Sequence, residues 1–290
     1  MATITPAAIT FERILVPTDF TDISQRALEY AKVLAKPANS ELLLVHVSPL
    51  PDLITTPEAA WIDVSGIQKQ DAEELEQTGA ALRSEGYRAR AISLTGSLYN
   101  ELLSILKECK VDLVVAGTHS KKGLDRFLAG SDAEALLRQA ACPVLCVGPA
   151  VPELRGKTWN IREIICATTL DPNSAQVATV AQKLAAVHQA ELVLFHVKDP
   201  GAKQEPDYET FEEAFRAHGS ESLGAYAWLR PRVDSRSPAA SIVDLATSRR
   251  SDLIVMGARS ASPIVTHLEG GIVADVLAHA PCPVMTLPQR

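Results

Sequence analysis

Several features that mark large classes of proteins are scarce in this sequence. Aromatic residues make up 5% of the 290 residues, and no apolar run is long enough to cross a bilayer. Acidic residues outnumber basic ones by 35 to 28, so the composition offers no basic excess for binding nucleic acid or an anionic membrane. We therefore expect neither nucleic acid nor a membrane among the partners.

The cysteines do not suggest a disulfide or metal framework. The chain has five of them, and none forms a C-x-x-C pair. Cys142 and Cys146 would lie on one face of a strand, about 13 Å apart, which is too far for a disulfide or a shared tetrahedral metal. We expect them to be buried apolar residues in a reducing compartment. Since residues 1–13 have neither a basic segment nor a long apolar core, the expected location is the cytoplasm.

Motifs that carry catalysis in other proteins are missing too. The sequence contains no G-x-S-x-G, no H-E-x-x-H and no cluster of metal ligands. Gly156-Lys157-Thr158 imitates the end of a Walker A loop, but Val151 stands where that motif needs glycine and no strand precedes it. We expect His119, which is isolated, to be a bystander. The protein is therefore not expected to be an enzyme.

What the sequence does contain is one long internal repeat. Four residues recur at a constant offset of 140, namely Asp112, Gly117, Gly130 and Cys142 at Asp252, Gly257, Gly270 and Cys282. Near the front of each copy the offset is 150, as for His46 and His196. A repeat this long indicates two copies of one domain. The predicted division is a first domain over residues 1–148, a linker over 149–161 and a second domain over 162–290.

Each copy alternates apolar runs with amphipathic segments. In the first copy the runs predict strands at 13–19, 41–47, 87–93, 112–116 and 142–147. Helices are predicted from 21, over 67–84, over 98–110 and from 131, with an irregular excursion over 48–66. The second copy repeats this order with a shorter middle over 198–222. Such alternation predicts an α/β fold, with a doubly wound parallel sheet in each domain.

The best candidate for a binding site follows the strand at 112–116. Gly117 ends that strand, and a loop with glycines and hydroxyls runs on to Gly130 and Ser131, where a helix is predicted to begin. A glycine-containing loop between a strand and a helix N-terminus directs backbone N–H groups and the helix dipole at one place. This arrangement suits a phosphate. Ser131 and Glu134 also form a capping box, which explains the serine without a ligand.

These residues resemble the ATP-binding branch of the universal stress protein family, in its tandem two-domain form. That branch carries Gly, two residues, Gly, nine residues, then Gly and Ser or Thr after a strand, with an aspartate ending the first strand. Asp19, Gly117, Gly130 and Ser131 match this pattern. The resemblance covers nearly the whole chain. It implies five-stranded parallel sheets of order 3-2-1-4-5, paired through their last strands about a pseudo-two-fold axis.

The resemblance also implies roles for individual residues. Asp19 would hydrogen-bond the nucleoside, and Val47 and Ala116 would lie against adenine and ribose. Gly117, Gly130 and Ser131 would hold the phosphates, which Mg²⁺ can accompany.

Two residues depart from the pattern of the first copy. Ser120 stands where the second glycine belongs, and a side chain there is unfavourable if that position needs φ > 0. Asp132 places a carboxylate that would repel a phosphate. In the second copy Thr169 replaces the aspartate, Ser260 the middle glycine and Gly271 the terminal hydroxyl, so its site is expected to be degenerate.

Two functions remain open from the sequence, and a third is weaker. The leading hypothesis is a cytoplasmic stress-response regulator that binds an adenine nucleotide in its first domain. The alternative is an interaction or small-ligand module in which both sites are degenerate, which Ser120 and Asp132 favour. A nucleotide hydrolase or transferase has least support. Expected partners are the nucleotide, an unidentified protein and a second copy of the chain, and the two domains are expected to pair with each other within one chain.

Overall fold

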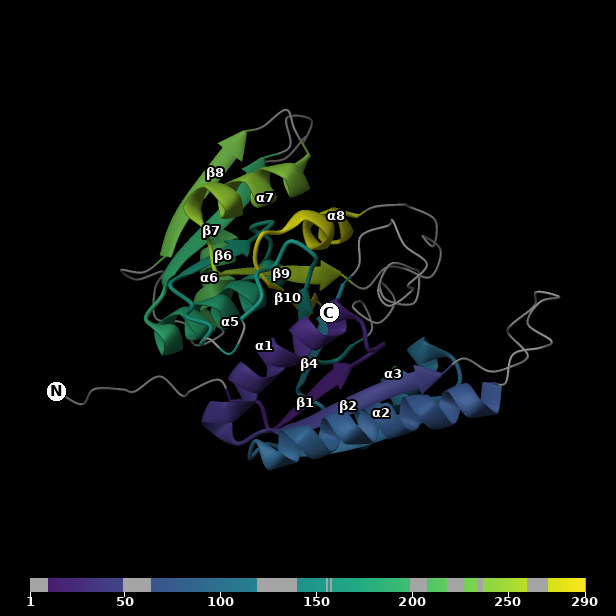
Figure 1. The fold of residues 1–290 in the computed structure, drawn as a ribbon. Helices are drawn as coiled ribbons and strands as arrows, with labels where there is room; N and C mark the ends of the chain where they lie inside the picture. The colour runs from purple at the N-terminus through teal and green to yellow at the C-terminus, as the bar shows by residue number, and fades with distance from the viewer. Residues whose placement is uncertain are drawn as a thin grey trace. The chain divides into compact units, whose positions relative to one another are not determined.

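The computed structural model describes most of both halves of the chain. The described residues are 10–48, 64–118, 140–154, 156, 158–198, 208–217, 227–233, 237–259 and 271–289. By contacts the chain separates into two compact units, one of Phe11–Val144 with Leu154–Gly156 and the other containing Leu145–Glu153 and Lys157–Arg290. Each half is an α/β arrangement of strands and covering helices (Figure 1).

The first copy of the repeat has five strands, and its pairs β1–β2, β1–β4 and β2–β3 are parallel. Its strands are β1 (Arg13–Pro17), β2 (Glu41–Ser48), β3 (Arg88–Thr95), β4 (Leu113–Gly117) and β5 (Val144–Val147). Its described helices are α1 (Asp22–Ala38), α2 (Val64–Ser84) and α3 (Leu98–Glu108). The strand order is β3-β2-β1-β4-β5, with β1 in register against β2 and β4 on its two sides.

The helices of the first half divide between the faces of its sheet. The connections β1-α1-β2 and β2-α2-β3 step in the same direction across the sheet, whereas β3-α3-β4 crosses back in the opposite direction. Because such crossovers are right-handed, α1 and α2 cover one face and α3 covers the other. Both faces of β1, β2 and β4 are thereby covered, which is why these strands read as continuous apolar runs.

The second half repeats this topology. Its strands are β6 (Glu163–Ala167), β7 (Glu191–Lys198), β8 (Ala227–Val233), β9 (Leu253–Arg259) and β10 (Val284–Gln289). Its helices are α5 (Pro172–His188), α6 (Tyr208–Ala217), α7 (Pro238–Arg249) and α8 (Ile272–His279). The order is β8-β7-β6-β9-β10, and all pairs are parallel.

The repeated aspartates Asp112 and Asp252 have a structural role at the amino-terminal edge of each sheet. The Asp112 carboxylate accepts hydrogen bonds from the backbone N–H groups of Glu12 and Arg13, at 2.7 and 3.1 Å. Asp252 does the same for Arg162 and Glu163, at 2.8 and 3.1 Å. Each aspartate thus ties the start of the fourth strand of its copy to the start of the first strand.

The predicted parallel sheets and the strand order are confirmed, and a few boundaries differ. β2 includes Ser48 and α2 already begins at Val64, so both ends of the excursion predicted over 48–66 are regular structure. In the shortened middle of the second half, where the sequence indicated no definite element, lies α6. The pairing of the two domains through their last strands and the domain boundaries at 148 and 162 stay predictions.

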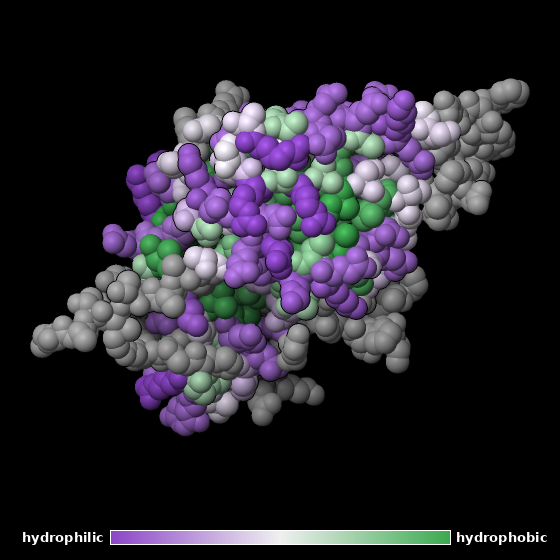
Figure 2. Space-filling view, turned by 90° about the horizontal axis from the view of Figure 1, so that it is seen from below, coloured by the Kyte–Doolittle hydropathy of each residue, from purple (hydrophilic) through white to green (hydrophobic). Residues whose placement is uncertain are grey.

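Few large hydrophobic side chains are exposed among the described residues. Figure 2 shows one face of the molecule, where hydrophilic residues cover most of the described area. The exposed large hydrophobic residues come from three different helices, and they are Ile67, Val187 and Ile272. Within the described ranges, no helix is both long and apolar enough to span a membrane.

Candidate functional site

The candidate site lies at the carboxyl-terminal edge of the first sheet, where β1, β2 and β4 end. Pro17 is paired with Val45 of β2, and Leu15 with Val114 of β4. Continued past these pairs, the two registers match Asp19 with Val47, two residues beyond the last β1–β2 pair, and with Thr118, four residues beyond the last β1–β4 pair. These three residues, Val47, Asp19 and Thr118, form what we term the edge row. Open parallel sheets bind ligands at this edge.

The residues just before the edge row pack against α1. Thr18 lies 3.2 Å from the hydroxyl of Ser24 in α1, and Gly117 lies against Ile23 of the same helix. Because successive side chains of a strand alternate between faces, Ala116 is directed to the opposite face, on which α3 lies, and it is fully buried there. Asp19 and Thr118 follow the ends of their strands, and the Asp19 carboxylate bonds Thr21 at the start of α1.

A tight turn after β1 holds Asp19 in place. Phe20 has a left-handed backbone with φ of 62°, which reverses the chain between the strand and α1. The Thr18 hydroxyl accepts a hydrogen bond from the Phe20 N–H at 3.1 Å. Asp19 Oδ1 accepts two more, from the N–H of Thr21 at 3.2 Å and from its hydroxyl at 2.6 Å. Thr21 in turn is the N-cap of α1.

These contacts engage only one of the two oxygens of the Asp19 carboxylate. Oδ1 has two donors, whereas Oδ2 has no hydrogen-bond partner among the described residues. Asp19 is partly exposed, so Oδ2 can accept a hydrogen bond from a ligand. The structure therefore places the first predicted binding residue with a free acceptor at the sheet edge.

Thr118 is a residue of this edge that the sequence did not single out. Its side chain is 4% exposed, and its hydroxyl is buried without a hydrogen-bond partner in the described part of the chain. The hydroxyl of Ser48, at the end of β2, is also buried without a hydrogen-bond partner there. An unpaired buried hydroxyl costs about 1–3 kcal/mol. Both hydroxyls lie at the carboxyl-terminal edge of the first sheet, and Thr118 lies in the edge row.

Gly117 has a packing role that is independent of any ligand. A Cβ atom at this position would lie 2.7 Å from Cγ2 of Ile23 and 2.9 Å from its carbonyl carbon and oxygen. The first turn of α1 therefore packs directly onto the end of β4, and only glycine leaves room for it. The sequence predicted a different reason for this glycine, namely the close approach of the backbone to a phosphate.

His46 links the turn after β1 to α2. Its Nδ1 lies 2.8 Å from the carbonyl oxygen of Thr18, and its Nε2 lies 3.3 Å from a carboxylate oxygen of Asp71. The ring also packs against Phe20, with a centroid distance of 4.7 Å. The His46 side chain is 13% exposed, and both of its ring nitrogens have partners. Its contacts help to fix the turn that carries Asp19.

The structure brings together four of the predicted site residues. Asp19, Val47, Ala116 and Gly117 all lie at the carboxyl ends of neighbouring strands. Ser120, Gly130 and Ser131 lie outside the described residues, as do His119 and Asp132, so their predicted roles stay predictions.

The second half has the same turn, but its carboxylate follows the left-handed residue instead of preceding it. Leu170 has a φ of 57°, and its N–H donates to the Thr168 hydroxyl at 3.0 Å. Here Thr169 precedes the left-handed residue and Asp171 follows it, the reverse of the order in the first half. The Thr169 hydroxyl donates to Asp171 Oδ2 at 2.7 Å. Asp171 Oδ1 accepts from the N–H of Ser174 at 2.9 Å and so caps α5.

The row of the second half therefore lacks the polar groups of the edge row. Its residues, found from the corresponding registers, are Val197, Thr169 and Ala258. Ala258 replaces the threonine, and the carboxylate is used in the helix cap. Gly257 differs from Gly117 as well, because the flexible side chain of Gln289 packs against it rather than a helix backbone. These differences agree with the predicted degeneracy of the second site.

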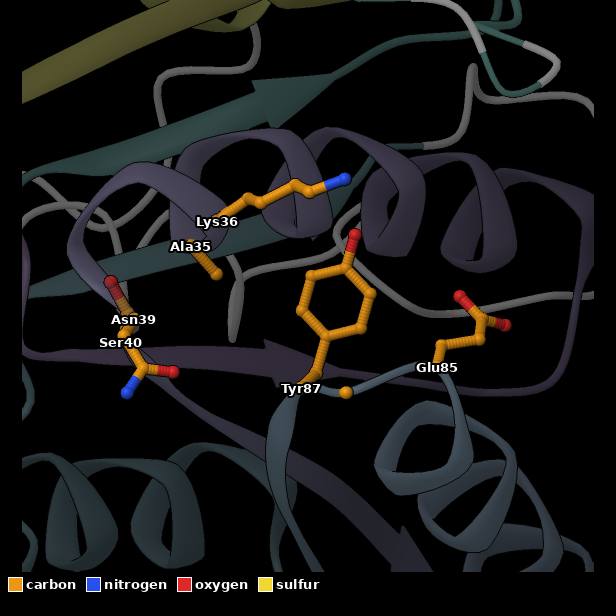
Figure 3. A pocket seen from close by; sticks show the side chains of 7 residues that line it. Ala35, Lys36, Asn39, Ser40, Glu85 and Tyr87 are labelled. Atoms are coloured by element: carbon orange, nitrogen blue, oxygen red, sulfur yellow. The ribbon is translucent and has the colours of Figure 1, made fainter.

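A surface pocket of the first half lies at the other edge of the sheet. Its lining residues precede β2 and β3, and they are Ala35, Lys36, Asn39, Ser40, Glu85, Gly86 and Tyr87 (Figure 3). Lys32 stabilises its wall, with Nζ 2.8 Å from a Glu85 oxygen and 5.6 Å from the centre of the Tyr87 ring. Burial lowers the pKa of Lys32, but hydrogen bonds to Glu85 and Glu29 outweigh this and raise it overall. This pocket is not part of the candidate site.

The described residues contain no group of three or more His, Cys, Asp or Glu side chains that could hold a metal ion. All five cysteines are free thiols, and four of them are buried. Cys142 and Cys146 are among the buried ones, as predicted.

Comparison with known proteins matches both halves of the chain to one family. The model of the universal stress protein family matches residues 10–148 and 160–288. The universal stress protein MJ0531 of Methanocaldococcus jannaschii is 32% identical over 139 residues, which are 47% of this chain and 82% of that protein. The universal stress protein YxiE of Bacillus subtilis is 30% identical over 146 residues, 47% of this chain and 99% of that one.

Solved structures show the same fold over the whole chain. A universal stress protein from Archaeoglobus fulgidus superposes with a TM-score of 0.69 at 20% identity, covering 96% of both chains. A protein described as functionally unknown, PA1789 from Pseudomonas aeruginosa, superposes with a TM-score of 0.59 at 19% identity, covering 96% of this chain and 93% of that one. The tandem architecture is therefore shared with proteins of solved structure.

Proposed function

The chain belongs to the universal stress protein family, and on that premise we propose that its first half binds an adenine nucleotide, ATP in the first instance. The observation that carries the proposal is the edge row. Asp19 offers a carboxylate oxygen with no partner among the described residues, and Thr118, at the matching position after β4, has a buried hydroxyl without a partner. Val47 supplies the apolar contact of the same row. Together these groups fit the polar and apolar surfaces of a nucleoside.

The second half would then serve as a pseudo-symmetric partner that binds no nucleotide. Its carboxylate caps α5, and Ala258 stands where the first half has Thr118. We propose that the protein acts in the cytoplasm as a stress-response regulator and not as a catalyst. Mg²⁺ would accompany the nucleotide through its phosphates rather than through a metal site of the protein.

A direct test is to identify what the purified protein carries. The protein is denatured, and the released small molecules are identified by absorbance and chromatography. An adenine nucleotide near one per chain supports the proposal, and the stripped, refolded protein should then bind ATP in calorimetry. A protein that releases no nucleotide and gives no heat with added ATP, with or without Mg²⁺, contradicts it. Steady phosphate release that depends on His119 would contradict the non-catalytic part.

One observation favours the alternative of an interaction module. The packing of Ile23 against Gly117 already explains why this position is glycine, so the glycine is not by itself evidence for a phosphate. Ser120 and Asp132 point the same way in the sequence. On this alternative the edge row binds a group of a protein or a small ligand without phosphates. Failure of all adenine nucleotides in the calorimetric test would make it the better explanation.

A further inference from the structure

His46 lies between two hydrogen-bond acceptors, one at each nitrogen of its ring. Its Nδ1 is 2.8 Å from the carbonyl oxygen of Thr18, and its Nε2 is 3.3 Å from Oδ2 of Asp71 in α2. A backbone carbonyl and an ionised carboxylate only accept hydrogen bonds, whereas a neutral imidazole carries a single N–H. Only the doubly protonated, positively charged ring can therefore donate to both partners. In either neutral form, one ring nitrogen directs its lone pair at an oxygen.

These contacts connect two separate elements of the first half. Thr18 and Phe20 lie on either side of Asp19 in the turn after β1, and the His46 ring contacts both of them. Phe20 is the left-handed residue of this turn. Because Asp71 belongs to α2, the Nε2 contact connects the turn that carries Asp19 to that helix.

The second half has the same histidine without the second contact. Nδ1 of His196 lies 2.9 Å from the carbonyl oxygen of Thr168, which repeats the contact between His46 and Thr18. No carboxylate pairs with the His196 ring in the part of the chain that the structure describes. A ring with one N–H satisfies this contact, so the carbonyl alone does not require a second proton. Asp71 is what distinguishes His46 from its counterpart.

Among the described residues, Asp71 is the charged side chain that contacts the His46 ring. The side chains of the pair are 24% and 13% exposed, so solvent screens their attraction only in part. Across β3, the residue paired with His46 is the uncharged Ser93. The other charged groups of the turn, of the first turn of α1 and of α2 near Asp71 have different partners or are exposed. They are Asp19, which bonds Thr21, the exposed Asp22 and Glu74, and Lys69 and Glu73, which pair with each other.

We propose that His46 is a proton-controlled brace between α2 and the turn that carries Asp19. At mildly acid pH the ring carries two protons, donates to Thr18 and Asp71 and holds the two elements together. When it loses one proton, one of the contacts becomes unfavourable and the link is lost. Histidine suits this role because it changes charge between about pH 5 and 8. Since the folded contacts favour the charged ring, their contribution to stability is present at the acid end of this range and is lost as the pH rises.

The first measurement follows the ring itself. The ¹⁵N chemical shifts of the His46 imidazole, assigned by comparison with His46→Asn, report the protonation of each nitrogen. Between about pH 5.5 and 8 the ring should change from two protonated nitrogens to one. A ring that keeps the same protons over the whole range would overturn the proposal.

The second measurement compares denaturant unfolding of His46→Asn and His196→Asn at both ends of the range. The variants are matched, because the asparagine amide can still donate to the carbonyl of Thr18 or Thr168 but does not reach Asp71. The factor by which His46→Asn lowers the folding equilibrium constant should be roughly tenfold larger at about pH 5.5 than at pH 8. His196→Asn should lower it equally at both. The same pH difference in both variants, or in neither, would contradict the proposal.

Asp71→Asn tests the partner of the ring. Its amide can donate to the unprotonated Nε2, so this variant should be about as stable as the wild type at pH 8 and less stable at about pH 5.5. In the Asp71→Asn background, His46→Asn should have the same effect at both pH values. A pH difference that persists in this background would show that Asp71 is not what holds the second proton.

Discussion

The turn after the first strand uses the same residue types in both halves, but in opposite order. In the first half Asp19 precedes the left-handed residue and Thr21 follows it, whereas the second half has Thr169 before and Asp171 after. Both arrangements keep a hydrogen bond between a threonine hydroxyl and an aspartate carboxylate across the turn. The exchange is therefore nearly neutral for the turn.

The two orders differ in what the carboxylate can do next. When the carboxylate follows the turn, as in Asp171, it lies at the helix N-terminus. There it accepts a hydrogen bond from the Ser174 N–H and caps the helix. Before the turn it lies at the sheet edge, and Asp19 keeps one oxygen without a partner among the described residues. A change that the local fold tolerates thus decides whether a carboxylate is available to a ligand. The second half keeps the scaffold of the turn, although its carboxylate serves the helix cap.

The largest expected effect of this difference is on nucleotide affinity. Asp19→Ala should weaken ATP binding by roughly a hundredfold, because a hydrogen bond to a charged group is lost. Thr169→Ala, its counterpart in the second half, should leave the affinity unchanged. Calorimetric titration of both variants and the wild type measures this. Equal losses from the two changes would show that the halves bind alike and that the second site is not degenerate.

Thiol reactivity should also separate the halves. Burial raises the pKa of Cys166 and Cys282 in the second half to about 12, so at pH 8 only about one thiol in ten thousand is ionised. Burial raises the pKa of Cys146 to about 12, and burial together with the charge of Asp112 raises that of Cys142 to about 11. Cys109, which is partly exposed, should react with a thiol reagent about a hundredfold faster than these four.

At pH 8, native protein should therefore show one thiol per chain that reacts fast with the reagent. Denatured protein should show five thiols that react at the same rate. Cys109→Ser should remove the fast phase without changing the slow one. A fast phase that survives this substitution would mean that a thiol from one of the cores is accessible.

The two strand-end glycines should respond differently to alanine. Gly117→Ala forces a Cβ against the backbone of Ile23 and should lower the free energy of unfolding by about 2–3 kcal/mol. In Gly257→Ala the three atoms nearest to the new Cβ all belong to the movable side chain of Gln289, so this change should cost under about 1 kcal/mol. Denaturant unfolding curves for the two variants measure the difference. Similar costs at both positions would show that α1 does not pack on β4 as closely as described.

The smallest expected difference concerns the helix caps. Asp171→Ala removes a 2.9 Å hydrogen bond from a charged cap and should cost about 1–2 kcal/mol. Thr21→Ala removes a 3.4 Å bond from a neutral one and should cost about 0.5–1 kcal/mol. Thermal or denaturant unfolding of the two variants tests the order. A larger cost at Thr21 would indicate that its contact with Asp19 contributes more than the cap.

The fold was accessible from the sequence because it depends on local and periodic patterns. Buried parallel strands require apolar runs, covering helices require amphipathic segments, and the long repeat shows that this pattern occurs twice. Polar residues at strand ends, such as Asp19, were also visible as candidates. The strand order came from the family resemblance, and the structure confirms it.

The tertiary structure alone decided which of these residues meet and what each one is free to do. Thr118 and Asp19 lie at the same edge of the sheet because β4 pairs with β1, and this pairing of distant segments leaves no mark in the local sequence. Gly117 is glycine because a helix that begins far earlier in the chain packs on it. Whether an aspartate caps a helix or faces a ligand depends on which side of a left-handed residue it occupies. Such outcomes follow from close packing and hydrogen-bond geometry between elements, which composition and periodicity do not encode.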